Sequence, residues 1–207
     1  LHTAYRRQRQ MCIRDRIGKI IDSWPVKVSL DHAIKWVMQF DAEHYPLAVR
    51  ILNNIDILDS YSIRSALEVA HTKLIRKISE KGSPMEKYNT LFAAIGNTAK
   101  SGSLIAYHYR TTVGLSEKDF VSNDDEDKLD LSKIENIVLV DDVIGSGKTI
   151  AHEVKRVAEE VYSLTKSRNL FVLTVAGYED GIKHVIEETG ATVVTALEYL
   201  SLIHISE

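Results

Sequence analysis

Two adjacent carboxylates and a turn of small residues stand at the centre of the chain. Residues 137–150 read IVLVDDVIGSGKTI, so an apolar run leads into Asp141 and Asp142, two aliphatic residues, and the turn Gly145–Gly147. The four apolar residues at its start predict a strand buried on both faces. The turn is followed by Lys148–Thr149, which open an amphipathic helical stretch.

Each part of this segment has a chemical use. Glycines let a backbone curl so that successive N–H groups converge on an anion. The helix N-terminus behind the turn adds unpaired donors and a positive dipole end, and Ser146 and Thr149 add hydroxyls. The segment therefore predicts a phosphate site. Asp141 and Asp142 are acceptors only, so they suit sugar hydroxyls or a metal ion rather than phosphate oxygens.

A second polar loop occurs upstream in a similar setting. Residues 90–95 form a short apolar run that predicts a buried strand, and a helix is expected over about 103–110. The loop between them contains Lys100. Because ligands bind at the carboxyl ends of the strands of a parallel sheet, both loops can face one site.

The central segment resembles the PRPP-binding signature of the type I phosphoribosyltransferases, which combines an apolar strand, an acidic pair, two aliphatic residues and a small-residue loop ending in Gly-x-Thr. The resemblance implies that Asp141 and Asp142 hold the ribose hydroxyls. It also implies Mg²⁺, which these aspartates would bind indirectly, mainly through PRPP and water. The 5-phosphate would be wrapped by Val143, Ile144, Gly145, Ser146, Gly147, Lys148 and Thr149.

The same resemblance assigns two further groups of residues. Lys100 becomes a third catalytic residue beside the aspartates, because it would face the pyrophosphate. Its loop would comprise Asn97, Thr98, Ala99, Lys100, Ser101 and Gly102. A base-side loop is expected at Gly177 and Tyr178, where Tyr178 could stack on a nucleobase; core packing or a plain turn is an equal alternative.

Two departures from the family pattern affect the functional prediction. Gly145 stands where the family usually carries Thr, Ser, Ala or Asp, and the segment 111–136 is shorter and more acidic than the family's mobile hood. One prediction is therefore a transferase that moves phosphoribosyl from PRPP to a nitrogen nucleophile and releases pyrophosphate. The alternative is a non-catalytic module that senses PRPP or a nucleotide, similar to members associated with bacterial defence effectors.

A P-loop is the main rival for the same residues. The end of G-x-x-x-x-G-K-[ST] fits Gly147–Thr149, but the first glycine should stand at position 142, where Asp142 is found. A P-loop NTPase is therefore a weaker alternative. A strand–turn–helix connection without any ligand is a further alternative.

Both ends of the chain resemble translated sequencing-adapter sequence. The stretch RRQRQMCIRD at residues 6–15 and the stretch LSLIHISE at residues 200–207 match the two strands of a transposase-based adapter. We therefore interpret residues 1–16 and 200–207 as adapter artefacts in a sequence of metagenomic type, and exclude them from the natural segment.

Excluding the termini changes the composition. Cys12, the single cysteine, falls away, so no disulfide, thiol nucleophile or cysteine metal site is expected. Five arginines and two acidic residues also drop out, which moves the formal net charge from −3 to about −6. An acidic chain gives no electrostatic argument for nucleic acid.

Nothing in residues 17–199 is apolar enough to span a membrane, so we expect a cytoplasmic protein. Two kinds of protein partner are compatible with the sequence, namely a second copy in a homodimer and an effector that is either a missing C-terminal part or a neighbouring protein.

The expected organisation has a helical N-terminal region at 17–87 and an α/β domain at 88–199. Ser29 and Ser60 are expected helix N-caps, Pro46 a first-turn residue, and Gly82 a helix stop. Later elements are predicted as a helix at 149–165, a strand at 170–175, a helix at 181–188 and a strand at 192–197. The fold class is α/β, with the Rossmann-like parallel sheet that the phosphoribosyltransferase resemblance implies.

Overall fold

The computed structural model describes residues 2–82, 84–85, 89–96, 101–120, 133–162 and 169–200. The chain divides into two compact units, residues 1–62 and 63–207. This boundary falls inside helix α4 (Ser60–Glu80), so the last helix of the predicted 17–87 region belongs mainly to the second unit. The acidic stretch at 123–127, the end of the helix predicted to reach residue 165, and residues 201–207 lie outside the described residues.

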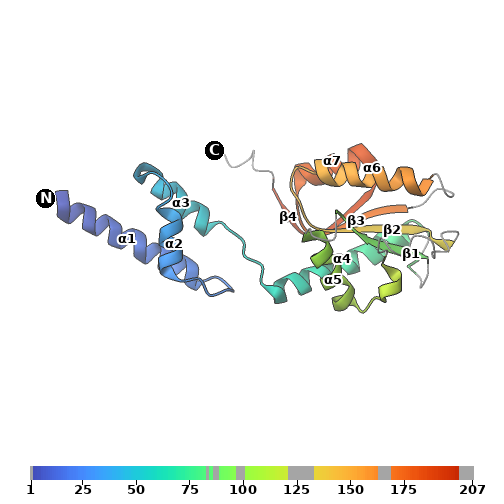
Figure 1. The fold of residues 1–207 in the computed structure, drawn as a ribbon, viewed down its shortest axis with the longest axis horizontal. Coiled ribbons are helices and arrows are strands. Elements are labelled where there is room, and N and C mark those ends of the chain that lie inside the picture. Colours follow the sequence, from blue (N-terminus) through green and yellow to red (C-terminus); the bar gives the residue numbers. More distant parts are fainter. Residues whose placement is uncertain are drawn as a thin grey trace. The chain divides into compact units, whose positions relative to one another are not determined.

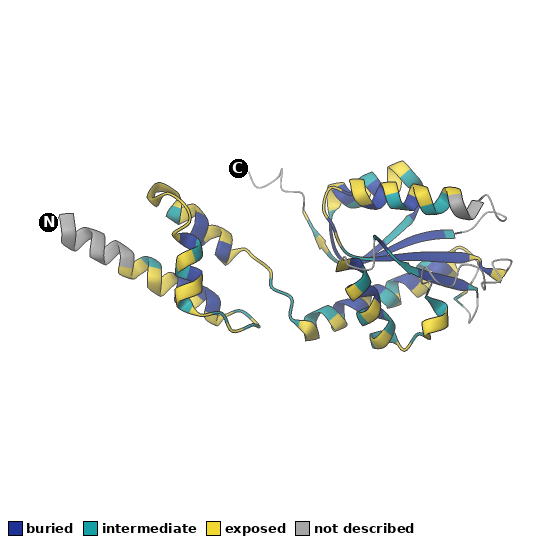
Figure 2. Cartoon of the chain, viewed as in Figure 1, coloured by how far each residue is buried: buried dark blue, intermediate teal, exposed yellow. Residues whose placement is uncertain are grey.

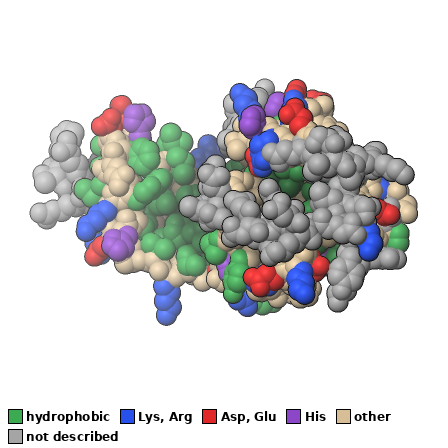
Figure 3. Space-filling view, turned by 45° about the vertical axis from the view of Figure 1, so that its right-hand side comes forward, with side chains coloured by type: hydrophobic (Ala, Val, Ile, Leu, Met, Phe, Trp, Pro, Cys, Tyr) green, Lys and Arg blue, Asp and Glu red, His purple; other side chains and the backbone are tan. Residues whose placement is uncertain are grey.

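The first unit is a small helical assembly. Its elements are α1 (His2–Asp22), α2 (Leu30–Val37), the short 3-10 helix η1 (Ala42–His44) and α3 (Tyr45–Asn53). Ile17, Val37 and Ala48 are buried at its centre. Figure 3 shows apolar side chains gathered on the visible face of this unit, and Met38, Leu47 and Ile51 are among its exposed apolar residues.

The cap and stop signals predicted for the N-terminal helices hold with one correction. Ser29 caps α2, because its side chain accepts a hydrogen bond from the His32 N–H at 3.2 Å, and Pro46 lies in the first turn of α3. Gly82 follows α4 with a φ of 82°, a left-handed conformation that favours glycine. Ser60 was the expected cap of α4, but Asp59 accepts from the Ser62 N–H at 2.8 Å instead. Asp is as good a cap as Ser, so the helix gains its cap one residue earlier.

The second unit is built on a parallel four-stranded sheet with helices on both faces. The strands are β1 (Thr90–Ala94), β2 (Asn136–Ile144), β3 (Asn169–Tyr178) and β4 (Thr192–Tyr199), in the order β1-β2-β3-β4. Helices α6 (Lys148–Tyr162) and α7 (Glu179–Thr189) cover one face, and α4 and α5 (Ser101–Val113) cover the other (Figure 1). The predicted Rossmann-like α/β class is confirmed.

The direction in which successive strands are added to the sheet changes between β1 and β2. After α5 and the short 3-10 helix η2 (Glu117–Asp119), Phe120 forms a parallel bridge with Phe92 of β1. Phe92 is also in register with Val138 of β2. Phe120 and β2 therefore flank β1 on opposite sides, so the chain crosses over β1 and α5 lies on the face opposite α6. Two neighbouring strands whose connections leave in opposite directions define a switch point, where parallel α/β sheets bind ligands.

Most residues of the sheet strands are buried (Figure 2). Leu139, Ile144 and Val172 pack beneath α6 and α7 with other aliphatic residues. On the opposite face, Tyr109 is fully buried, its ring lies tilted against that of Phe92, and its hydroxyl shares a 2.7 Å hydrogen bond with His71 Nδ1 of α4. Burial raises the pKa of the Tyr109 hydroxyl well above its usual range, so this group stays protonated and can donate.

A short row of polar side chains fixes the strand register. Asn136 is fully buried at the start of β2, donates to Thr90 Oγ1 of β1 at 3.3 Å, and accepts from Asn169 Nδ2 of β3 at 3.0 Å. A slip by one residue would leave these buried groups unpaired, which is costly. This row explains why three aliphatic strands adopt one alignment.

Among the described helices, none combines the length and the apolar character needed to cross a membrane.

We predict that removing residues 1–16 changes the free energy of unfolding of the first unit by about 1 kcal/mol or less. Among the described side chains before Ile17, only Ile13 is partly covered, whereas Ile17 is 1% exposed. Ile17→Ala is expected to cost about 2–5 kcal/mol. Both tryptophans, Trp24 and Trp36, lie in this unit, so fluorescence in a urea titration reports on it. A deletion as damaging as Ile17→Ala would contradict the prediction.

Candidate functional site

Strand β2 extends through the acidic pair. The sequence indicated a strand ending at Val140, but β2 continues to Ile144, so Asp141, Asp142 and Val143 are strand residues rather than loop residues. The reason is pairing with β3, which is also longer than predicted: Asp141 is in register with Thr174, and Ile144 with Gly177. Local sequence patterns do not predict this pairing, because the two strands are distant in the chain.

Beyond Val140, β2 no longer has β1 beside it. The last registered pair joins Ala94 to Val140, and the Ile95 N–H donates to the Val140 carbonyl at 2.9 Å. The aspartates then supply local acceptors, because Asp141 Oδ1 accepts from the Asp142 N–H at 2.9 Å and Asp142 Oδ1 accepts from the Val143 N–H at 2.7 Å. Both carboxylates are half-buried and are oriented by their own backbone.

The turn after β2 packs directly on the first turn of α7. Gly147 has a φ of 77°, and its carbonyl accepts from the Ala151 N–H at 2.8 Å, which starts α6. A Cβ on Gly147 would collide with the Gly181 carbonyl, and a Cβ on Gly181 would collide with the Gly145 carbonyl. These glycines therefore allow a backbone approach that any side chain would prevent. The sequence did not single out Gly181.

A cavity of about 700 Å³ opens at the switch point. It lies between the ends of β1 and β2, the start of α5 and the first two turns of α6. The described residues that line it are Ile95, Gly96, Ser101, Asp141, Asp142, Val143, Gly145, Ser146, Gly147, Thr149, Ile150, His152 and Glu153. The cavity thus joins Ser101 of the first predicted loop to most residues of the second.

Most predicted residues of the phosphate loop reach this cavity. Ile144 is the main exception, because it is fully buried in the core beneath α6 and α7. Lys148 is exposed and is not among the described lining residues. Gly102 is not among the described lining residues, and an added Cβ there would come within 2.5 Å of the Ile95 carbonyl and 2.9 Å of Asp141 Oδ1. Residues 97–100 lie outside the described residues, so the role of Lys100 stays a prediction.

Gly177 and Tyr178, which were expected in a base-side loop, lie in a strand instead. Gly177 and Tyr178 are the last residues of β3, and α7 begins at Glu179 without an intervening connection. The Tyr178 ring lies 5.6 Å from that of Tyr199 at the end of β4, and neither Gly177 nor Tyr178 is among the described lining residues. Pairing of β3 with both neighbours extends the strand over the glycine.

Two cavity residues with ionisable side chains were missed by the sequence analysis. His152 and Glu153 lie one helical turn after Lys148 and Thr149, so they project along the same side of α6. The signal that could have found them is this spacing of three and four residues from Thr149. A polar residue in the second turn of a helix is common on any surface, which is why the spacing alone is weak.

The donor set suits a metal ion that is held mainly by a ligand. Within the described ranges, no cluster of three or more His, Cys, Asp or Glu side chains could bind a metal ion. The half-buried pair Asp141 and Asp142 can still accept hydrogen bonds from water or from sugar hydroxyls. These residues fit Mg²⁺ bound chiefly by ligand oxygens and water, since Mg²⁺ keeps several waters and needs few carboxylates.

The geometry disfavours the P-loop alternative. A P-loop needs four residues between its two glycines, which cradle phosphates with their N–H groups after the strand has ended. Here Asp142 takes the place of the first glycine and is still within β2, which leaves only Gly145–Gly147 between strand and helix.

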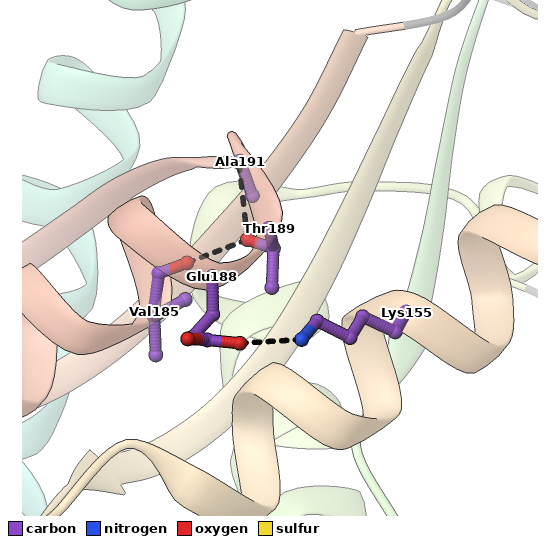
Figure 4. Close-up of polar contacts among 5 residues, drawn as sticks. All are labelled: Lys155, Val185, Glu188, Thr189 and Ala191. Atoms are coloured by element: carbon purple, nitrogen blue, oxygen red, sulfur yellow. Dashed lines mark hydrogen bonds and ion pairs between the residues drawn. The ribbon is translucent and has the colours of Figure 1, made fainter.

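An ion pair also joins the middle of α6 to the last turn of α7. Lys155 Nζ of α6 donates to Glu188 Oε2 of α7 at 2.5 Å, as drawn in Figure 4. Thr189 Oγ1 donates to the Val185 carbonyl at 2.6 Å and accepts from the Ala191 N–H at 3.1 Å, which closes the end of α7 (Figure 4). The turn that bears the cavity is thus attached to two helices that contact each other.

Comparison with known proteins gives one family and several distant structures. The profile of the PRTase-CE family matches residues 33–205. Orotate phosphoribosyltransferase from Aeropyrum pernix is 16% identical, with a TM-score of 0.40 over 67% of this chain and 70% of that one. The AQ2163 protein from Aquifex aeolicus is 12% identical, with a TM-score of 0.46 over 86% and 88%. A hypothetical protein from Neisseria gonorrhoeae with bound ppGpp is 14% identical, with a TM-score of 0.38 over 69% and 79%. No curated protein matches the chain.

We predict that Gly181→Ala destabilises the second unit by about 1–3 kcal/mol, because the new Cβ would displace the Gly145 carbonyl. The matched control is Gly145→Ala, whose Cβ would have no atom within 4 Å and whose stability should stay near wild type. Urea unfolding followed by circular dichroism measures both. Equal stability of the two variants would show that the close glycine packing is not needed.

We predict a pH-dependent contribution from the Lys155–Glu188 pair. Lys155 holds the pKa of Glu188 below its ordinary value of 4.5, so the stabilisation is present above that pH and is lost as pH falls through the folded pKa. The melting temperature of Glu188→Gln should therefore lie below wild type at pH 7 and converge with it as the pH falls below the folded pKa of Glu188. Glu187→Gln, which removes a looser 3.8 Å pair with Lys183, is the control and should show a smaller difference.

Proposed function

The chain belongs to the PRTase-CE family, a phosphoribosyltransferase-like family, and from this we propose that its cavity binds PRPP or a related ribose 5-phosphate nucleotide together with Mg²⁺. The observation that carries the proposal is the convergence of two chemical features on one cavity. A half-buried carboxylate pair and a glycine turn at a helix N-terminus line the same 700 Å³ space.

Each feature suits a different part of such a ligand. Backbone N–H groups of the turn Gly145–Gly147 and the start of α6 would bind the 5-phosphate. Asp141 and Asp142 would accept hydrogen bonds from the ribose hydroxyls, which a phosphate could not donate. Bound Mg²⁺ would neutralise charge on the pyrophosphate. Ser101 at the start of α5 lines the opposite side of the cavity, where the pyrophosphate would lie, and Lys100 would precede it.

Transferase activity is the finer part of the proposal. A nitrogen nucleophile would form a bond to the anomeric carbon of the ribose while the bond from that carbon to the pyrophosphate oxygen breaks. Pyrophosphate would leave with the bonding electrons, and the nucleophile would pass its proton to solvent water. Positioning and electrostatics can supply most of this catalysis, so the lack of a carboxylate at Gly145 does not exclude it. The same lack favours the second candidate, a module that binds the ligand without turning it over.

The test is calorimetric titration of the full chain with Mg²⁺–PRPP and Mg²⁺–ATP, beside Asp141→Asn/Asp142→Asn. We expect a PRPP Kd in roughly the micromolar range and much weaker ATP binding. Each lost charge-assisted acceptor should raise the Kd about tenfold or more, so the double variant should lose measurable binding.

Two outcomes would change the interpretation. If the protein binds ATP but not PRPP, and the double substitution does not change ATP binding, the site would be a nucleoside triphosphate site instead. PRPP binding without pyrophosphate release in the presence of candidate purine, pyrimidine and amine acceptors would select the sensing module over the transferase.

A further inference from the structure

The second turn of α6 forms part of the cavity wall. His152 and Glu153 both line the cavity, three and four residues after Thr149. Side chains on a helix lean toward its N-terminus, over the residues three and four positions earlier. His152 therefore leans over Lys148 and Thr149, toward the turn where a phosphate would bind.

The charge of the cavity makes His152 stand out. The described lining residues include three carboxylates, Asp141, Asp142 and Glu153, and neither lysine nor arginine. Their other polar side chains are hydroxyls, so His152 is the one described lining side chain with a nitrogen donor. A phosphate in this cavity meets backbone N–H groups and hydroxyls, and His152 is placed to add a further donor.

Glu153 would repel a phosphate if its charge were not balanced. Its Oε1 accepts from Arg156 Nε at 3.2 Å and from Arg156 Nη2 at 2.5 Å, a forked contact to one oxygen. The Glu153 side chain is only 19% exposed, so this pair is shielded more than an ordinary surface ion pair. Arg156 thus compensates the carboxylate that lies closest along the helix to Thr149.

We propose that His152 is a phosphate-binding residue of this cavity. Its imidazole would donate a hydrogen bond to the phosphate bound by the Gly145–Gly147 turn and Thr149, while Arg156 neutralises the neighbouring Glu153. This inference rests on the proposed function, because it assigns a further contact to the same ligand. It identifies the 5-phosphate, rather than the pyrophosphate, as the group that His152 contacts.

The experiment compares His152→Ala with wild type in titrations of PRPP and of ribose 5-phosphate, both with Mg²⁺. One lost hydrogen bond to a charged group should raise the Kd about tenfold, and for both ligands, since they share the 5-phosphate. His152→Gln, which keeps an N–H donor, should recover part of the loss. His32→Ala is the matched control, because His32 is exposed in the first unit and is not among the lining residues.

A second arm tests the compensation of Glu153. Arg156→Gln should raise the Kd of both ligands several-fold, because it leaves the carboxylate unbalanced near the phosphate. Adding Glu153→Gln should restore binding, since it removes the repelling charge. Such recovery is not expected if Arg156 contributed only to helix stability. An Arg156→Gln variant that binds as wild type would overturn the compensation.

The outcomes separate this inference from the proposed function. Wild-type protein that binds neither ligand overturns both. Wild-type binding that is lost in Asp141→Asn/Asp142→Asn but unchanged in His152→Ala supports the proposed function and overturns the role of His152. A His152→Ala loss for PRPP alone overturns the assignment to the 5-phosphate.

Discussion

The close contact between the Gly145–Gly147 turn and Gly181 is the constraint on which the rest of the site depends. Backbone meets backbone there, so the first turn of α7 sets the path of the turn that starts α6. The Lys155–Glu188 pair joins the same two helices farther along. A phosphate bound at this turn would meet N–H groups whose positions are fixed before it arrives, and such preorganisation lowers the cost of binding.

The reversal of the chain around β1 makes room for the cavity. Phe120 and β2 flank β1 on opposite sides, so the connections after β1 and β2 leave toward opposite faces of the sheet. Beyond Val140 the second strand continues without β1, and Asp141 and Asp142 provide acceptors to their own backbone. The acidic pair therefore occupies the point where pairing with β1 stops, which explains how two carboxylates can follow the fully buried part of β2.

The sequence predicted the parts of this structure that local signals encode. The buried strand before Asp141, the helix after Gly147, the Ser29 cap and the Gly82 stop all have short-range causes. The sequence could not predict the features that arise from contacts distant in the chain. Examples are the extension of β2 to Ile144 by β3, the need for glycine at 181, and the buried Asn136 row. His152 and Glu153 were missed because only the fold shows which side of α6 faces the cavity.

The electrostatics of the cavity indicate how it can accept an anion at all. Three of its described lining side chains are carboxylates, so attraction by lysine or arginine cannot be the main source of affinity within the described part. The helix N-terminus and the turn supply oriented N–H groups. Arg156, which is not among the described lining residues, offsets the negative charge of Glu153. Backbone donors bind phosphate by position rather than by side-chain charge. The negative charge at the two ends of the ligand would be met by different groups. A bound metal ion would neutralise charge on the pyrophosphate, and the His152 imidazole would donate a hydrogen bond to the 5-phosphate.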